Sequence, residues 1–267
     1  KARKGLNNVT KQFLNNGNKA YKRGDLEKAT QYYLKAVQFD KQFHLAFYQL
    51  GVLEKKMGNS DLAISYFNKA IEIKPDFHKA WFTLGTSYEA DNHLDSAIVK
   101  YNKAIELNPG YTKAYNNLGN IYIIKEDYDS AKDVLLTAIQ IDPTYADAYL
   151  RLGVLFSEQE FFIEASEQFK KATDYDEKNY DAWFRYASAL NSIKHYEDAS
   201  FAAQKCIDIK TTFGGGWYEK GVAEWKDGKG NKERGKKYFN EANKYRDWRK
   251  LAQRKIDEIN NPTKYEK

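Results

Sequence analysis

The residues of this sequence best suited to nucleophilic or metal chemistry are four histidines and one cysteine, Cys206. Such chemistry needs several side chains within a few ångströms of one another. His44 and His78 stand 34 residues apart, and His93 and His195 fall in widely separated turn sequences. The sequence also contains no HExxH motif, no CxxC motif and no phosphate-binding glycine loop after a strand. We therefore expect no metal site, no cofactor and no enzymatic activity.

A run of three glycines, Gly214 to Gly216, is the remaining candidate for a ligand site, as a phosphate cradle. It follows a predicted helix end instead of a strand, so the cradle is not favoured. Because glycine is a poor helix former, we expect the next helix to begin only at about Trp217. Cys206 occupies a position that is alanine elsewhere in the repeating pattern described below, which favours a small packed residue over a nucleophile.

Composition limits the class of protein. The chain has 267 residues, of which 42% are hydrophobic and 30% charged, as in soluble folded proteins. No stretch approaches the ~20 apolar residues of a membrane span. One cysteine excludes an internal disulfide framework, which leaves open a cytoplasmic, a bacterial periplasmic or an exported location. Since the chain begins at Lys1 without Met, we expect a trimmed N-terminus.

A 34-residue period runs from Thr10 to about Phe213 and positions most of the aromatic and small residues. The fourth residue of each period is aromatic: Phe13, Phe47, Trp81, Tyr115, Tyr149, Trp183 and Trp217. Four residues later stand Gly17, Gly51, Gly85, Gly119, Gly153, Ala187 and Gly221. The second half carries a column of small residues at Ala29, Ala63, Ala97, Ala131, Ala165 and Ala199, and another at Ala36, Ala70, Ala104, Ala138, Ala172 and Cys206. Each half-period therefore reads as one amphipathic helix.

The glycine column has a physical meaning. A glycine in the middle of a helix costs roughly 1 kcal/mol relative to alanine, so its recurrence predicts that a neighbouring helix occupies the space of the missing side chain. Gly24-Asp25 and Gly58-Asn59 predict the turn between the two helices of a unit, and Pro75, Pro109 and Pro143 predict the end of the second helix.

These columns resemble the tetratricopeptide repeat. The unit from His78 to Tyr111 carries every element of that pattern: Trp81, Leu84, Gly85, Tyr88, Ala97, Tyr101, Ala104 and Pro109. The resemblance implies an all-α fold, a right-handed superhelical solenoid of antiparallel helix pairs. The expected organisation is an N-terminal extension at 1–9, seven repeats at 10–43, 44–77, 78–111, 112–145, 146–179, 180–213 and 214–247, a capping helix at 248–261 and a tail at 262–267.

In the last repeat, we expect a lengthened internal turn from Asp227 to Gly235. In the helix after it, we expect Trp248, Leu251 and Ile256 to cover the end of the repeat array.

In this family the first helix of each repeat lines a concave groove. The residues on the first helices that point away from the packed columns are therefore the expected partner-binding residues. They are Asn18, Tyr48, Gln49, Lys55, Lys56, Lys79, Phe82, Lys113, Asn116, Asn117, Asn120, Arg151 and Arg185. Among the groove-facing positions of the first four repeats, six lysines stand against one glutamate, and side-chain amides can hold an extended backbone as donor and acceptor.

These residues partly resemble two better-known modes of peptide recognition. The clamp that grips a chaperone's C-terminal carboxylate is matched by Asn18 and Lys79, but Leu14, Gln49 and Thr83 replace its other residues. The segment AYNNLGNIY of the fourth repeat looks like the substrate-reading helix of the nucleocytoplasmic glycosyltransferase, although no transferase domain is present. Neither mode is favoured.

The sequence therefore predicts a scaffold or adaptor whose partner is a protein or peptide with acidic and apolar or aromatic residues. The alternative is an electrostatic docking module for nucleic acid, acidic lipid or another acidic polymer. It rests on residues 226–255, which hold twelve Lys or Arg and four Asp or Glu, a net charge of +8.

Overall fold

The computed structural model describes the backbone of residues 2–227 and 231–265, and side chains from residue 8 onward. Every regular element in these ranges is a helix. In chain order they are α1 (Ala2–Lys22), α2 (Leu26–Phe39), α3 (His44–Met57), α4 (Ser60–Ile73), α5 (His78–Ala90), α6 (Leu94–Leu107), α7 (Thr112–Ile124), α8 (Tyr128–Ile141), α9 (Ala146–Glu158), α10 (Phe162–Tyr175), α11 (Tyr180–Ser192), α12 (Tyr196–Ile209), α13 (Gly214–Lys226), α14 (Lys232–Ala242), α15 (Arg246–Asn260) and the short 3-10 helix η1 (Pro262–Lys264).

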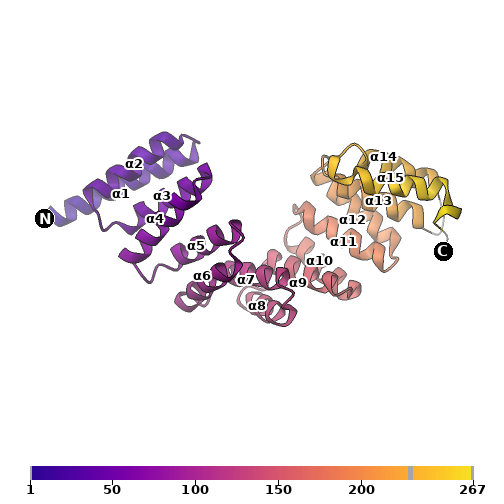
Figure 1. Cartoon of the computed structure of the whole chain (residues 1–267), viewed down its shortest axis with the longest axis horizontal. Helices are drawn as coiled ribbons and strands as arrows, with labels where there is room; N and C mark the ends of the chain where they lie inside the picture. Colours follow the sequence, from indigo (N-terminus) through magenta and orange to yellow (C-terminus); the bar gives the residue numbers. More distant parts are fainter. Residues whose placement is uncertain (1, 228–230, 266–267) are drawn as a thin grey trace. The chain divides into compact units, whose positions relative to one another are not determined.

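The helices form two compact units, residues 1–121 and 122–267, with the boundary inside α7. In unit 1, consecutive helices pair as α1 with α2, α3 with α4 and α5 with α6. In unit 2, α9 pairs with α10, α11 with α12 and α13 with α14, and α15 follows. Short turns join the two antiparallel helices of each pair (Figure 1). The fold is therefore all-α and built of tandem helix pairs.

Each pair is held by a ring that lies against a glycine. At Gly85, a Cβ atom would be 2.7 Å from the Tyr101 ring, closer than real Cβ atoms approach. The same relation joins Gly51 with Phe67, and it recurs at Gly17 with Tyr33, Gly153 with Phe169 and Gly221 with Phe239. This confirms that the glycine column makes room for a neighbouring helix. The rings belong to the second helix and are fully or almost fully buried, whereas most of the aromatic residues at the fourth position are only half-buried.

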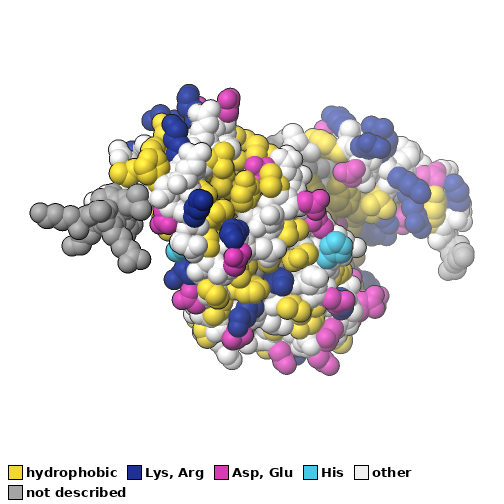
Figure 2. Space-filling model, turned by 60° about the vertical axis from the view of Figure 1, so that its left-hand side comes forward, with side chains coloured by type: hydrophobic (Ala, Val, Ile, Leu, Met, Phe, Trp, Pro, Cys, Tyr) yellow, Lys and Arg dark blue, Asp and Glu magenta, His cyan; other side chains and the backbone are white. Residues whose placement is uncertain are grey.

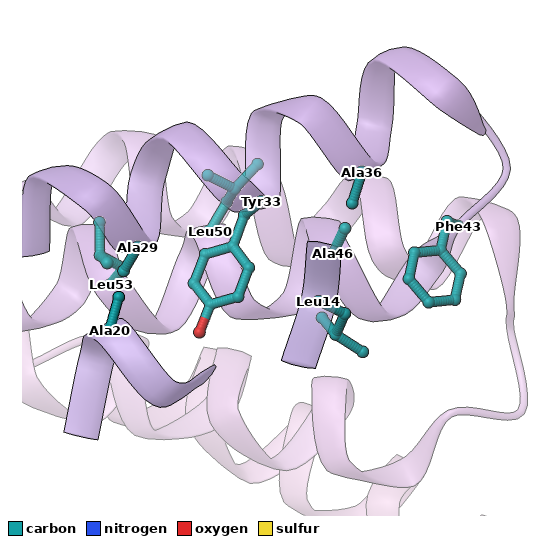
Figure 3. Close-up of a cluster of buried hydrophobic side chains, with 9 residues drawn as sticks. All are labelled: Leu14, Ala20, Ala29, Tyr33, Ala36, Phe43, Ala46, Leu50 and Leu53. Atoms are coloured by element: carbon teal, nitrogen blue, oxygen red, sulfur yellow. The ribbon is translucent and has the colours of Figure 1, made fainter. Parts of the chain in front are cut away.

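The core is continuous from one pair to the next within a unit. Figure 3 shows one such cluster, in which Tyr33 of α2 lies among small and branched side chains of three successive helices. Its members are Leu14, Ala20, Ala29, Tyr33, Ala36, Phe43, Ala46, Leu50 and Leu53. Alanines of the two columns keep the helices close because they add no bulk at the contact.

The turns inside the pairs follow the expected chemistry. Gly24 and Gly58 adopt φ values of +81° and +85°, a left-handed conformation that glycine reaches without steric cost. Asp25 then caps α2, since its side chain accepts a hydrogen bond from the backbone N–H of Lys28. The predicted turns at Gly24-Asp25 and Gly58-Asn59 are confirmed.

Three expectations near the C-terminus are wrong. Helix α13 begins at Gly214 instead of Trp217, because the glycines are needed for packing: Cβ atoms at Gly214 and Gly215 would be 2.8 Å from the Trp248 ring. Helix α14 begins at Lys232, so Gly235 lies inside a helix and not in a turn. Leu251 is 45% exposed, and Ala252 and Ile259 are the buried residues of α15.

Helix α15 also begins at Arg246, two residues earlier than expected. Residues 228–230 of the basic region and residues 266–267 of the tail lie outside the described residues. Within the described ranges, no helix combines the length and hydrophobicity required to cross a bilayer.

Candidate functional site

A polar surface crosses three successive first helices of unit 1: α3, α5 and α7. On α3, the Lys55 ammonium donates a hydrogen bond to the Thr86 hydroxyl of α5 at 2.6 Å. Burial lowers the pKa of Lys55, and the carboxylates of Glu89 and Asp91 oppose that shift. Lys55 is therefore a half-buried cation that is already bound to the next helix.

The second part of this surface is a hydrogen-bond network around Glu89. Tyr101 donates its hydroxyl proton to one carboxylate oxygen at 2.5 Å, and Asn120 of α7 donates to the other at 3.2 Å. Asn117 donates to the Tyr101 hydroxyl at 3.1 Å. Burial, and then the bond to Glu89, raise the pKa of Tyr101, so it stays a neutral donor. The network fixes both amide side chains in one orientation.

Two rings lie beside the polar surface. Tyr48 packs on Phe77, with ring centroids 5.2 Å apart, and its hydroxyl lies 3.2 Å from that of Thr83. Phe82 packs on Tyr111, with centroids 5.0 Å apart. Tyr48 and Phe82 are both half-buried, so part of each ring remains open to solvent.

The predicted lysines differ in their surroundings. Lys79 and Lys113 are exposed, whereas the Lys56 ammonium lies 4.6 Å from the centroid of the Tyr21 ring. In Figure 2, which turns the left-hand side of Figure 1 toward the reader, dark blue and magenta side chains are interspersed with yellow ones. No single sign of charge covers the face turned toward the reader in that view.

Asn18 and Gln49 lie apart from the network, whereas Asn116 is joined to its edge by a hydrogen bond donated to the Asn117 side-chain oxygen at 3.5 Å. Asn18 accepts a hydrogen bond from the Tyr33 hydroxyl at 2.9 Å, which commits its side chain to the core of its own repeat. Gln49 is half-buried. Asn116 is only 6% exposed, so little of its side chain is accessible to a partner. It occupies the register position of Tyr48 and Phe82, but its side chain is buried more deeply than those two half-buried rings.

Unit 2 contains the two predicted arginines. Arg151 is half-buried, and Arg185 of α11 donates from Nε to Asp181 at 2.9 Å. No pattern in the sequence points to Glu219 of α13, which is 7% exposed and accepts a hydrogen bond from Asn191 at 2.8 Å. Burial raises the pKa of Glu219 to about 7, against the opposing effect of its hydrogen bonds to Asn191 and Ser188 and the charge of Lys255.

Cys206 and the histidines His44 and His78 are packed against other side chains of the fold. Cys206 is buried, and burial raises the pKa of its thiol to about 12. His44 and His78 pack edge-on against Phe77 and Tyr111, each with centroids 5.1 Å apart. No cluster of His, Cys, Asp and Glu suited to a metal ion occurs among the described residues.

Part of the basic C-terminal region lies on one face of α15. Three arginines and a lysine line an open concavity of about 690 Å³ there, together with Asn243, Gln253 and Asp257. The four cations are Arg246, Arg249, Lys250 and Arg254. Asp257 is bound by Lys264 at 2.7 Å, and hydrogen bonds from Lys264, Tyr265 and Asn261 lower its pKa to about 2. Elsewhere in the region, Arg234 pairs with the buried carboxylate of Glu224 at 2.5 Å.

Comparison with known proteins gives a consistent result. Family models described as "Tetratricopeptide repeat" match residues 44–77 and 150–205, and one described as "TPR repeat" matches 90–123 and 119–160. None of the curated proteins matches the chain.

Solved structures share the fold. The crystal structure of MamA protein is 27% identical, with a TM-score of 0.55, over 64% of this chain and 93% of MamA. YrrB, described as a TPR protein with an unusual peptide-binding site, is 23% identical, with a TM-score of 0.57, over 70% of this chain and 96% of YrrB. A tetratricopeptide repeat protein from Parabacteroides merdae ATCC 43184 is 14% identical, with a TM-score of 0.67, over 95% of this chain and 100% of that protein.

Proposed function

This chain belongs to the tetratricopeptide repeat family, and from that premise we propose that it is a non-enzymatic scaffold that binds an extended segment of a partner protein across α3, α5 and α7. The observation that carries the proposal is the network of Glu89, Tyr101, Asn117 and Asn120. It holds two side-chain amides in fixed positions on one helix face.

The amides are suited to a peptide backbone. Each amide has two N–H donors and one acceptor oxygen, and the network uses one donor of Asn117 and one of Asn120. The Asn117 oxygen also accepts a hydrogen bond from Asn116 at 3.5 Å. The remaining N–H groups and the Asn120 oxygen match the alternating C=O and N–H groups of an extended chain. Because the network sets the side-chain orientation before binding, less conformational entropy is lost when the partner arrives.

The flanking residues define the side chains of the partner. Exposed Lys79 and Lys113 favour acidic residues, and the half-buried Phe82 ring favours an apolar or aromatic residue beside them. Exposed ion pairs contribute only about 0.2–1 kcal/mol each, so the lysines steer the partner more than they hold it. The ring supplies more of the affinity, as aromatic residues do at interfaces.

The test uses peptides selected from a displayed library on the wild-type chain, with binding kinetics measured by surface plasmon resonance. Lys79→Glu with Lys113→Glu should slow association, and more strongly at low salt. Phe82→Ala should speed dissociation. The matched control is Lys35→Glu, an exposed lysine on the second helix α2. If the Lys79→Glu, Lys113→Glu and Phe82→Ala chains bind normally and the Lys35→Glu control loses binding, the site lies on the other face of the repeats.

A second candidate function is supported by the four cations on the outer face of α15. Arg246, Lys250 and Arg254 are four residues apart, so they stand about 6 Å apart along the helix. Such a row suits a polyanion. Binding of duplex DNA or of phosphatidylserine vesicles that weakens steeply with salt, and is lost with Lys250→Glu and Arg254→Glu, would support it. Binding unaffected by salt would exclude it.

A further inference from the structure

Neighbouring first helices are bridged at one recurring pair of positions. The twelfth residue of one repeat faces the ninth residue of the next, and we call this pair a rung. Within unit 1, two rungs are closed by hydrogen bonds, Lys55 to Thr86 at 2.6 Å and Asn120 to Glu89 at 3.2 Å. Within unit 2, the rung of Ile123 and Val154 is apolar, and both residues belong to one hydrophobic cluster. In each of these rungs, side chains fill the gap between the helices.

One rung of unit 2 is made of two serines, Ser157 on α9 and Ser188 on α11. Both side chains are too short to fill the gap, and a pocket of about 160 Å³ lies there. Its eight lining residues are Ser157, Phe162, Phe169, Phe184, Arg185, Ser188, Ala189 and Ser192. The pocket therefore coincides with the place where the bridging side chains are missing.

From this geometry we infer that the Ser157–Ser188 pocket binds one aliphatic side chain of a partner segment, with a carboxylate of the same segment held by Arg185. The inference rests on the proposed scaffold function, but it does not depend on the surface of α3, α5 and α7. It assigns to unit 2 a binding site with a specificity of its own.

The lining determines the class of side chain. Three phenylalanines make the pocket mainly apolar, and two of its three serines, Ser188 and Ser192, already have partners within the chain. Ser192 donates to the backbone oxygen of Ser188 at 3.1 Å, and Ser188 is hydrogen-bonded to Glu219. A polar side chain would therefore lose hydrogen bonds to water without replacement. An aliphatic one gains contact with the rings.

The volume restricts the size. The pocket is smaller than the roughly 300–1,000 Å³ of sites for drug-sized ligands, and its 160 Å³ equal the liquid volume of about five water molecules. This space suits a single Leu, Ile or Met side chain. Waters in an apolar pocket are poorly bound, so their displacement by such a side chain is favourable.

Arg185 supplies the charge preference because it is the one charged residue of the lining. Its Nε donates to Asp181, and the two terminal NH₂ groups of the guanidinium remain for a second acceptor. A carboxylate is the acceptor that the guanidinium fork matches in shape and charge. An aliphatic residue with Asp or Glu close to it in sequence satisfies both requirements.

The test pans a displayed library of random twelve-residue peptides against the wild-type chain and against Ser157→Leu, which fills the pocket. Peptides enriched on the wild type should share an aliphatic residue near Asp or Glu. Ser157→Leu should bind them about tenfold more weakly or worse, as expected when an interface anchor is removed. The matched control is Ser96→Leu on an exposed position of α6, which should bind normally.

A second variant keeps the test decisive if Ser157→Leu folds poorly. Arg185→Gln should weaken binding of a selected peptide. It should not weaken binding of the same peptide in which Gln replaces the acidic residue. A double-mutant cycle over the two protein chains and the two peptides measures this coupling. Peptides without the aliphatic residue, or equal binding by all variants, would overturn the inference. Loss of peptide binding with Phe82→Ala alone would also overturn the inference, but it would agree with the proposed function. Peptides lost with Ser157→Leu but not with Phe82→Ala would support the pocket and contradict the surface of unit 1.

Discussion

The Tyr101 ring lies so close to Gly85 that a Cβ atom at residue 85 would be 2.7 Å from its Cε1 atom. Tyr101 is fully buried and bound to Glu89, so the ring has no space to withdraw. The contact joins the core of the third repeat to the polar network on its surface. A change at Gly85 therefore tests packing and the candidate site together.

We predict that Gly85→Ala destabilises the fold. Alanine gains roughly 1 kcal/mol of helix propensity, but overpacking costs about 1–3 kcal/mol, so the net loss of stability should be up to about 2 kcal/mol. Urea denaturation measures it. Gly110→Ala is the matched control because its Cβ would meet only Asn108 Oδ1 at 3.6 Å, an ordinary contact. Equal stability of the Gly85→Ala chain would contradict the ring contact.

We predict that Phe67→Ala costs more than Trp81→Ala. Phe67 is fully buried, and its loss should cost about 3–5 kcal/mol. Trp81 is half-buried, although its indole N–H donates to the Pro75 oxygen at 2.8 Å, and about 2 kcal/mol is expected from the smaller area removed from water. Thermal unfolding of both variants gives the order. The reverse order would show that the half-buried column carries the stability.

We predict a pH-dependent stability that arises from Glu219. Its pKa is raised from 4.5 to about 7, so between these values the unfolded chain has lost a proton that the folded chain keeps. The contribution of this group to stability therefore falls as the pH rises from about 4.5 to about 7. At about 1.4 kcal/mol per pKa unit, the loss of stability is at most roughly 3–4 kcal/mol.

The measurement compares Glu219→Gln with the wild type by urea denaturation at pH 5 and pH 8. Glutamine keeps an acceptor oxygen for Asn191 and cannot ionise, so the variant should gain stability relative to the wild type at the higher pH. Glu158→Gln, an exposed carboxylate of unit 2, is the control. Parallel curves for Glu219→Gln and the wild type would show that Glu219 stays ionised in the fold.

We predict that removal of residues 246–267 promotes aggregation. Helix α15 covers Phe239 and Ala242 of α14 with Ala252 and Ile259, and its loss exposes that apolar surface. Light scattering detects the effect. Within α15, Ile259→Ala should cost about 2–4 kcal/mol, whereas Leu251→Ala should change little because its side chain is 45% exposed. A monomeric, equally stable truncated chain would show that α15 is not a cap.

The sequence could predict the helix pairs and the glycine contacts because each depends on spacing within one repeat. It could not place the start of α13. Glycine propensity is a local property, but the residue that requires small neighbours there is Trp248, 34 positions later. Likewise, Leu251 and Ala252 both fit a helical period, and only the position of α14 decides which of them is buried.

The candidate site was less predictable because its contacts also depend on residues that are distant in the sequence. The repeat spacing predicts that Asn117 lies on a first helix, but it does not predict that its side chain donates to Tyr101, because that contact depends on long-range geometry. Asn116, one residue earlier, points into the packing instead. Glu219 gave no signal at all, because its burial depends on Asn191 and Ser188 from the preceding first helix.

The position of the rungs in the repeat affects how the sequence of such a chain can evolve. The glycine and its ring occupy other positions of the repeat than the twelfth and ninth residues, so a substitution at a rung alters the surface while the packed columns stay as they are. Lys55→Ser or Thr86→Ser would then change the free energy of unfolding little, but it would change which side chain of a partner the rung binds. Selection on partners can act on one rung at a time, and duplication of a 34-residue unit adds another rung to vary.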